Sequence, residues 1–121
     1  MADSAARMKV LRPAIAACVV ALAFAPLCAR ADLANFDLSK ADVALGEYLS
    51  QTCVTCHQKS GVVQGGVPAI VGWPLEQFVA VMESYRKKER DNEVMRSLSA
   101  SLSNEDIVAL AAYFGSLKPA K

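Results

Sequence analysis

The sequence of 121 residues has little of the residue types that build several common sites. It contains a single histidine, His57, and of its four cysteines only Cys53 and Cys56 lie outside residues 1–31. A structural zinc site needs about four protein ligands, and a catalytic one about three with an open position. Beyond Cys53, Cys56 and His57 the domain has no further cysteine or histidine, and this shortage of ligands counts against a zinc site. A thioredoxin-type cysteine pair would follow a strand in a βαβ unit, and nothing upstream of Cys53 has the pattern of a strand.

An excess of charge of one sign is also missing. Residues 32–121 carry nine Lys and Arg against eleven Asp and Glu, so this part has a net charge of −2 with the histidine neutral. Such a balance does not indicate a nucleic-acid partner. Internal repeats, low-complexity segments and alternating strand patterns are absent from the sequence, which predicts a small all-α domain.

The chain has no apolar run of the roughly 20 residues that a membrane-spanning helix needs. Its longest apolar stretch, Ala14–Leu27, follows three basic residues and precedes a small-x-small cleavage site at Ala29–Ala31. This layout predicts a cleaved secretory signal peptide over 1–31 and a mature domain over 32–121. We therefore expect a periplasmic protein without stable membrane insertion, and an uncleaved membrane anchor is the alternative.

The most informative segment is Cys53–His57, in which two cysteines lie two residues apart and a histidine follows directly. This spacing is typical of covalent attachment of a c-type haem. Each thiol adds to one of two vinyl groups on one edge of a rigid macrocycle, and a single helical turn separates the thiols suitably. The adjacent His57 then lies beneath the iron as its proximal ligand. The segment predicts one covalently attached haem c.

Apolar residues at helical spacing predict three helices in the domain. The first extends from a Ser39 cap to about Gln51. It contains Gly46, which is either simply tolerated or marks the close approach of the last helix. The second begins at Trp73-Pro74, with the proline at a tolerated first-turn position. The basic run 86–90 near its end is a solvated helix end, a docking patch, or the source of a guanidinium that pairs with a haem propionate.

The last predicted helix begins at Ser103, with Asp106 in capping-box position, and Pro119 ends it. Between the second and the last helix, residues 91–103 are expected to form a polar, irregular stretch. A second segment without helical pattern, residues 58–72, contains four glycines and one proline and is expected to be a loop.

The loop over 58–72 also carries several valines, which suggests that it lies against the haem. A carbonyl in this loop, with that of Pro68 as the candidate, is suited to accept a hydrogen bond from the His57 ring. Such a bond would fix the ring nitrogen that does not bind iron.

The second axial ligand decides whether the iron is closed to substrates. Since His57 is the only histidine, Met82 and Met95 are the candidates in the mature domain. Met82 belongs to an apolar helical stripe, where core packing explains a methionine. Met95 lies in the polar stretch, where burial explains it less well, so the sequence favours Met95. An open sixth position would instead indicate a haem sensor or a peroxidase.

The domain resembles the class I c-type cytochromes over nearly all of residues 38–117. The features that carry the resemblance are Gly46 in a helix before Cys53–His57, Pro68 in the loop, Arg90 five residues before Met95, and Leu110–Tyr113 in the last helix. This resemblance implies coordination of the iron by His57 and Met95, and a Pro68 carbonyl on the His57 ring. It also implies terminal helices that cross near Gly46, Leu110 and Tyr113, with loops wrapped around one haem.

The spacing from Arg90 to Met95, together with residues 102–106, is similar to the cytochrome subunit of flavocytochrome c sulfide dehydrogenases. The resemblance implies an electron carrier, rather than an enzyme in itself, that serves a redox-protein donor and acceptor. The alternative is a haem subunit of an oxidoreductase with a flavoprotein dehydrogenase as partner. Arg90 and Trp73 are expected in the haem environment, where Trp73 shields the haem, donates to a propionate, or simply packs in the core.

Overall fold

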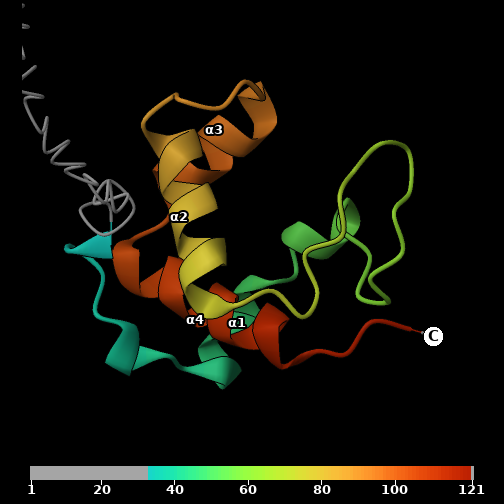
Figure 1. Ribbon diagram of the computed structural model, residues 1–121, viewed down its shortest axis with the longest axis horizontal. Coiled ribbons are helices and arrows are strands. Elements are labelled where there is room, and N and C mark those ends of the chain that lie inside the picture. The colour runs from blue at the N-terminus through green and yellow to red at the C-terminus, as the bar shows by residue number, and fades with distance from the viewer. Residues whose placement is uncertain (1–32, 121) are drawn as a thin grey trace, which may run out of the picture.

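The computed structural model describes residues 33–120 (Figure 1). The expected signal peptide lies outside the described residues. The helical elements are the short 3-10 turns η3 (Leu38–Lys40) and η4 (Cys53–Thr55) and the α-helices α1 (Val43–Leu49), α2 (Leu75–Arg86), α3 (Glu93–Ser101) and α4 (Asn104–Ser116). The described part contains no strand, only one isolated bridge between Gln64 and Val67. The predicted all-α class is therefore confirmed.

The first and last α-helices, α1 and α4, cross in contact at Gly46. A Cβ atom built on Gly46 would lie 2.0 Å from the Ala109 carbonyl oxygen and 2.7 Å from the Tyr113 Cβ. Only a hydrogen fits at this distance, so Gly46 marks the close approach of the last helix and is not merely a tolerated glycine. α1 ends at Leu49, one turn after this contact, and η4 begins at Cys53.

The core is built on α4, which is apolar on nearly all sides. Ile107, Leu110 and Phe114 of this helix are fully buried. Phe114 stacks on Phe78 of α2 with 5.8 Å between ring centroids, so α2 is held across α4. A helix that is apolar around its circumference needs neighbours on several faces, and α1 and α2 provide two of them.

The start of α1 differs from the prediction that Ser39 caps it. Residues 38–40 form the separate turn η3, and α1 begins at Val43 with Asp42 as its N-cap. One carboxylate oxygen of Asp42 accepts from the backbone N–H groups of Ala44 and Leu45, at 2.9 and 3.0 Å. An aspartate cap satisfies two free N–H groups and also carries negative charge at the positive end of the helix, which explains why the helix starts there.

The prediction of an irregular stretch over 91–103 was wrong, because residues 93–101 form the helix α3. Asn92 is the N-cap of α3, and the Asn92 side chain accepts from the backbone N–H of Met95 at 3.0 Å. The serine-rich sequence conceals the short apolar stripe of Met95, Leu98 and Leu102, which has helical spacing. The α4 prediction is confirmed, since Ser103 and Asp106 form the reciprocal capping box.

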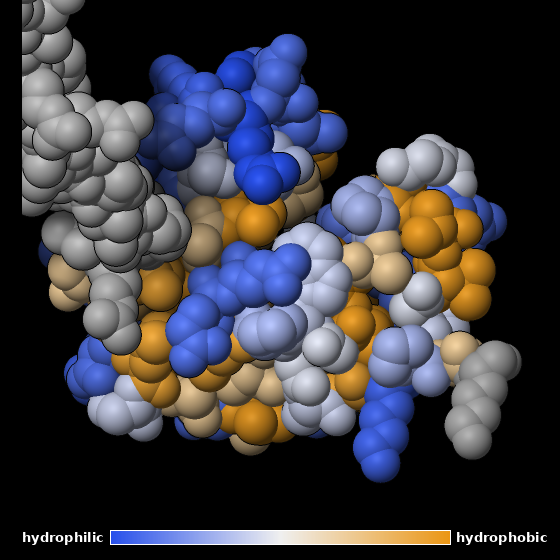
Figure 2. Space-filling view, viewed as in Figure 1, coloured by the Kyte–Doolittle hydropathy of each residue, from blue (hydrophilic) through white to orange (hydrophobic). Residues whose placement is uncertain are grey.

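The loop over 58–72 is fastened at several points. The Gly72 N–H donates to the Phe114 carbonyl at 2.9 Å, and the Ala120 N–H donates to the Ser60 carbonyl at 2.8 Å. The lobe on the right of Figure 2, which corresponds to this loop in Figure 1, carries a patch of apolar residues. Val62 and Val63 are exposed there, so only part of the loop lies against the rest of the domain.

Among residues 33–120, no helix has the length and apolar character needed to cross a membrane.

Candidate functional site

A cavity of about 820 Å³ opens between the two sides of the domain. In Figure 1, α2 and α3 stand on one side and η4 with the glycine-rich loop on the other, and residues of both sides line the cavity. Most lining side chains are apolar, among them Ile70, Phe78 and Leu110. Cofactor sites have volumes of about 300–1,000 Å³ and mainly apolar walls, so this cavity has the size and character of one.

The segment Cys53–His57 forms part of the cavity wall. Cys53 to Thr55 make the helical turn η4, and both thiols line the cavity. Neither cysteine is in a disulfide, and Cys56 is exposed while Cys53 is partly buried. Burial raises the pKa of the Cys53 thiol, because the apolar wall disfavours a thiolate. Two free thiols thus lie in the wall of an apolar cavity.

His57 is buried with 9% of its surface exposed and lines the same cavity. Its Nδ1 lies 2.8 Å from the Pro68 carbonyl oxygen, the contact that the resemblance implies. A carbonyl oxygen can only accept, so Nδ1 carries the hydrogen, and in the neutral ring Nε2 is the nitrogen with a free lone pair. A carbonyl that fixes the ring of a metal-binding histidine in this way is a common arrangement.

Both methionines of the described part, Met82 and Met95, line the cavity. The expectation that Met95 lies in an irregular stretch is wrong, because it is the third residue of α3. Met82 is 6% exposed and belongs to the hydrophobic core, whereas Met95 is only partly buried and packs at the edge of that core. Met82 and Met95 therefore differ in how deeply they are buried, and both line the cavity.

Arg90 and Trp73 also line the cavity. The Arg90 guanidinium carbon lies 5.9 Å from the centre of the Tyr85 ring, and Arg90 is the only charged residue in the lining formed by the described part of the chain. Sequence reasoning missed the lining residues Tyr85 and Asn92. The available signal for Asn92 was its residue type, since asparagine is a favoured helix cap.

Within residues 33–120, no group of three or more His, Cys, Asp or Glu side chains could hold a metal ion.

Comparison with known proteins gives the family. No family model matches the chain. The chain is 32% identical over 79 residues to cytochrome c-554(548) of Halomonas halodenitrificans, an alignment that covers 62% of the chain and 95% of that relative. It is 34% identical over 71 residues to cytochrome c4 of Pseudomonas aeruginosa, covering 54% of the chain. It is also 31% identical over 72 residues to the cytochrome subunit of sulfide dehydrogenase of Chlorobaculum tepidum, covering 60% of the chain and 66% of that relative.

The chain belongs to the c-type cytochromes, and its helices form the all-α cytochrome c fold. Members of this family transfer electrons through haem c. The match spans only 35% of the length of the cytochrome c4 relative.

The residues present fit a haem. The cavity is large and apolar, two free thiols lie in its wall, and a histidine with a fixed ring lines it. When bound, such a group supplies an iron that gains and loses one electron.

Proposed function

We propose that the protein is a periplasmic one-electron carrier with a single haem c, attached through Cys53 and Cys56 and ligated by His57 and Met95. The observation that carries the proposal is that these four side chains line one apolar cavity. In haem proteins, histidine and methionine ligation is the arrangement of electron-transferring cytochromes c. Such ligands close the iron to substrates while its oxidation state changes.

In this proposal each residue has a defined task. Cys53 and Cys56 form the thioethers and fix one edge of the ring. The free Nε2 of His57 binds the iron, and the Pro68 carbonyl keeps the imidazole from rotating by accepting from Nδ1. The apolar walls exclude water, which lowers the reorganisation that accompanies a change of charge at the iron.

Arg90 has a separate task as the partner of a propionate. Its guanidinium is the charged group that the cavity lining offers within the described residues, and a bidentate pair with a carboxylate suits it well. Trp73 is proposed to shield the neighbouring wall from water. Replacing Arg90 by Gln should lower the reduction potential, because a positive charge near the haem favours the ferrous state.

The choice of Met95 over Met82 is tested by two matched variants, Met95→Leu and Met82→Leu. Leucine keeps the apolar volume in both but removes the sulfur. We expect Met95→Leu to lose the weak long-wavelength absorption band that a methionine sulfur gives with ferric haem, and to bind carbon monoxide when reduced. Met82→Leu should keep the band and stay closed to carbon monoxide. The reverse pattern would assign the ligand to Met82, and carbon monoxide binding to the unmodified protein would indicate an open sixth site.

Export is tested by the intact mass of the protein from its native host. The basic start, apolar stretch and Ala29–Ala31 site support cleavage after residue 31. We expect the mass of residues 32–121 plus one haem under denaturing conditions. A mass that includes residues 1–31, or that lacks the haem, would contradict this part of the proposal.

A second candidate function is that of a haem subunit in an oxidoreductase complex. It is supported by the similarity to a cytochrome subunit of sulfide dehydrogenase, and a flavoprotein dehydrogenase would then be the partner. Mild purification from the native host distinguishes the two functions. A stable complex with a flavoprotein favours the subunit, whereas a monomer at native abundance favours the free carrier.

A further inference from the structure

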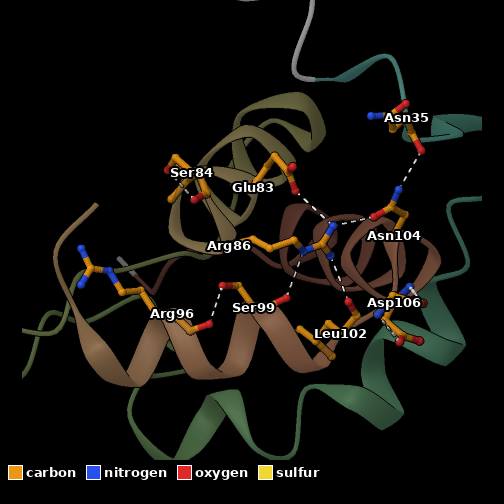
Figure 3. Close-up of polar contacts among 11 residues, drawn as sticks. Asn35, Glu83, Ser84, Arg86, Arg96, Ser99, Leu102, Asn104 and Asp106 are labelled. Carbon is orange, nitrogen blue, oxygen red and sulfur yellow. Dashed lines mark hydrogen bonds and ion pairs between the residues drawn. The ribbon is translucent and has the colours of Figure 1, made fainter. Parts of the chain in front are cut away.

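Two arginines connect α2 and α3 in a reciprocal way. Arg86, in the last turn of α2, donates from Nε to the Ser99 carbonyl at 3.2 Å and from Nη2 to the Leu102 carbonyl at 2.9 Å. Figure 3 shows the Arg86 side chain reaching between α2 and the end of α3. Both acceptors belong to the C-terminal end of α3, where carbonyl groups lack partners within the helix. Arg86 thereby holds the far end of α3.

Arg86 is itself held firmly in place. Its Nη1 donates to the Asn104 Oδ1 at 2.6 Å and lies 3.1 Å from the Glu83 Oε2. The Asn104 Nδ2 in turn donates to the Asn35 carbonyl at 2.8 Å, and the guanidinium lies over the Phe36 ring at 5.7 Å. The Arg86 side chain is only 25% exposed. Because several elements contact this one guanidinium, its position is fixed relative to the core.

Arg96 of α3 makes the complementary contacts to the turn after α2. Its Nε donates to the Arg90 carbonyl at 2.8 Å and its Nη2 to the Lys88 carbonyl at 3.2 Å. It also pairs with Glu93 and Asp91, at 2.7 and 3.3 Å, but these carboxylates are 87% and 96% exposed. Exposed ion pairs contribute little because water screens them. The two hydrogen bonds from Arg96 to main-chain carbonyls are therefore the contacts that hold α3 to the turn after α2.

Met95 lies in the first turn of α3, directly before Arg96 and one to two turns before the carbonyl groups that Arg86 binds. Its backbone N–H donates to the Asn92 Oδ1, and it is the direct neighbour of Arg96. A helix of nine residues moves as one body, so the bonds from Arg96 in its first half and to Ser99 and Leu102 at its C-terminal end fix the base of the Met95 side chain relative to α2. The α2 side of the cavity also carries Tyr85 and Arg90. The two arginines thus determine the geometry of the wall that presents the methionine sulfur.

We propose that Arg86 and Arg96 are positioning residues for the methionine ligand. Arg86 binds the main chain at the C-terminal end of α3, and Arg96 ties the first half of α3 to the main chain after α2. Together they keep the Met95 sulfur at the iron in both oxidation states. This proposal rests on the proposed ligation by Met95. Arginine is needed because its planar fork of donors reaches several carbonyl groups at once, whereas a lysine ammonium is a single compact donor group.

The consequence of losing one anchor is a sixth position that opens more often. Hydrogen bonds from a charged donor are among the stronger ones in proteins. Losing them at one end of α3 should raise the population of the methionine-free state by about tenfold or more. An exogenous ligand then binds faster, because it enters only after the sulfur has left. Methionine ligation raises the potential of a haem, so the potential should also fall.

The experiment compares holoprotein variants in matched pairs. Arg86→Lys and Arg96→Lys keep the positive charge but lose the forked donors. Glu83→Gln removes the carboxylate partner of Arg86, and Glu93→Gln removes the nearer of the two carboxylate partners of Arg96. Both variants leave the bonds of the arginines to the main chain. The measurements are the rate of cyanide binding to the ferric protein, the long-wavelength methionine band and the reduction potential. Far-UV circular dichroism checks that each variant keeps its helices.

We expect both lysine variants to bind cyanide about tenfold faster than the unmodified protein. They should also show a weaker methionine band and a lower reduction potential. Both glutamine variants should bind cyanide at a rate within about twofold of that of the unmodified protein. Equal rates in the lysine variants and the unmodified protein would overturn the proposal. So would glutamine variants as fast as the lysine variants, because the ion pairs would then hold the helix. If Arg86→Lys does not fold, Arg96→Lys decides alone, since its ion-pair partners are exposed.

Failure of the ligation itself has a different signature. In that case Met95→Leu does not change the cyanide rate, and the methionine band is either missing from the unmodified protein or retained in Met95→Leu because Met82 is the ligand. If the band and the Met95→Leu effect are present while the arginine variants behave like the unmodified protein, only the positioning role is wrong.

Discussion

At the scale of single residues, Lys88 has an unusual backbone conformation. Its φ of 62° is the one positive φ at a non-glycine position among residues 33–120. The residue follows the C-cap of α2, where its N–H donates to the Tyr85 carbonyl at 3.0 Å and the next N–H donates to the Ser84 carbonyl at 2.9 Å. This is the Schellman arrangement, in which glycine is the usual residue. The lysine side chain therefore costs free energy at this position.

Replacing Lys88 by Gly should stabilise the protein by about 1 kcal/mol, because glycine adopts a positive φ without steric cost. The free energy of unfolding in urea measures the effect. Lys88→Ala is the matched control, since it removes the same charge and keeps the strained conformation. If the alanine variant gained as much stability as the glycine variant, the charge and not the backbone would be responsible.

The residues of the site differ in how far the sequence alone predicts them. Cys53, Cys56 and His57 follow from the spacing of one short segment, because haem chemistry fixes that spacing. The role of Arg86 could not be predicted in this way. Its acceptors lie 13 to 18 positions further along the chain, and a basic run at a helix end has the same local pattern whether it is solvated or buried.

At the scale of elements, the long apolar helices were predictable and the short polar one was not. α4 has a capping box and an apolar pattern strong enough to define it. α3 has a serine-rich sequence of low helix propensity, and contacts from Arg86 and the Asn92 cap support it instead. The Ser39 prediction failed for a related reason, since Asp42 is a better cap close by. Short helices depend on tertiary partners that a local pattern does not contain.

The crossing of α1 and α4 leads to a prediction for Gly46. Gly46→Ala places a Cβ 2.0 Å from a main-chain oxygen, which cannot move without displacing α4. We expect a loss of at least about 3 kcal/mol in the free energy of unfolding, at the upper end of overpacking effects. Glu47→Ala, at the next and exposed position, should change stability by less than about 0.5 kcal/mol. Similar stability of the two variants would show that the helices can separate at no cost.

At the scale of the whole molecule, the cavity of about 820 Å³ occupies the place where a larger domain would have core side chains. A small domain buries only a modest fraction of its surface, so it commonly depends on a covalent or bound group for stability. Trp73, Phe78 and Leu110 line this cavity, so a bound group of matching size would complete the apolar core. Folding and haem attachment are therefore expected to be coupled.

A variant with both Cys53→Ala and Cys56→Ala tests this coupling. It keeps His57 and Met95 but cannot form thioethers, so we expect the haem to be extracted by acidified organic solvent. The free energy of unfolding should fall by at least about 3 kcal/mol, the stabilisation that a ligand far above its dissociation constant provides. Thr55→Ala, within the same segment and exposed, is the control and should keep the haem and the stability. Unchanged stability of the double variant would show that the fold does not need the attached group.

The most direct test of the proposed function is a redox titration of the purified native protein followed by its absorption spectrum. A single haem closed by His57 and Met95 predicts one reversible one-electron transition. The long-wavelength methionine band should accompany the ferric form throughout, and the ferrous form should not bind carbon monoxide. Two transitions, a ferric form without that band, or ready binding of carbon monoxide would contradict a closed, single-haem electron carrier.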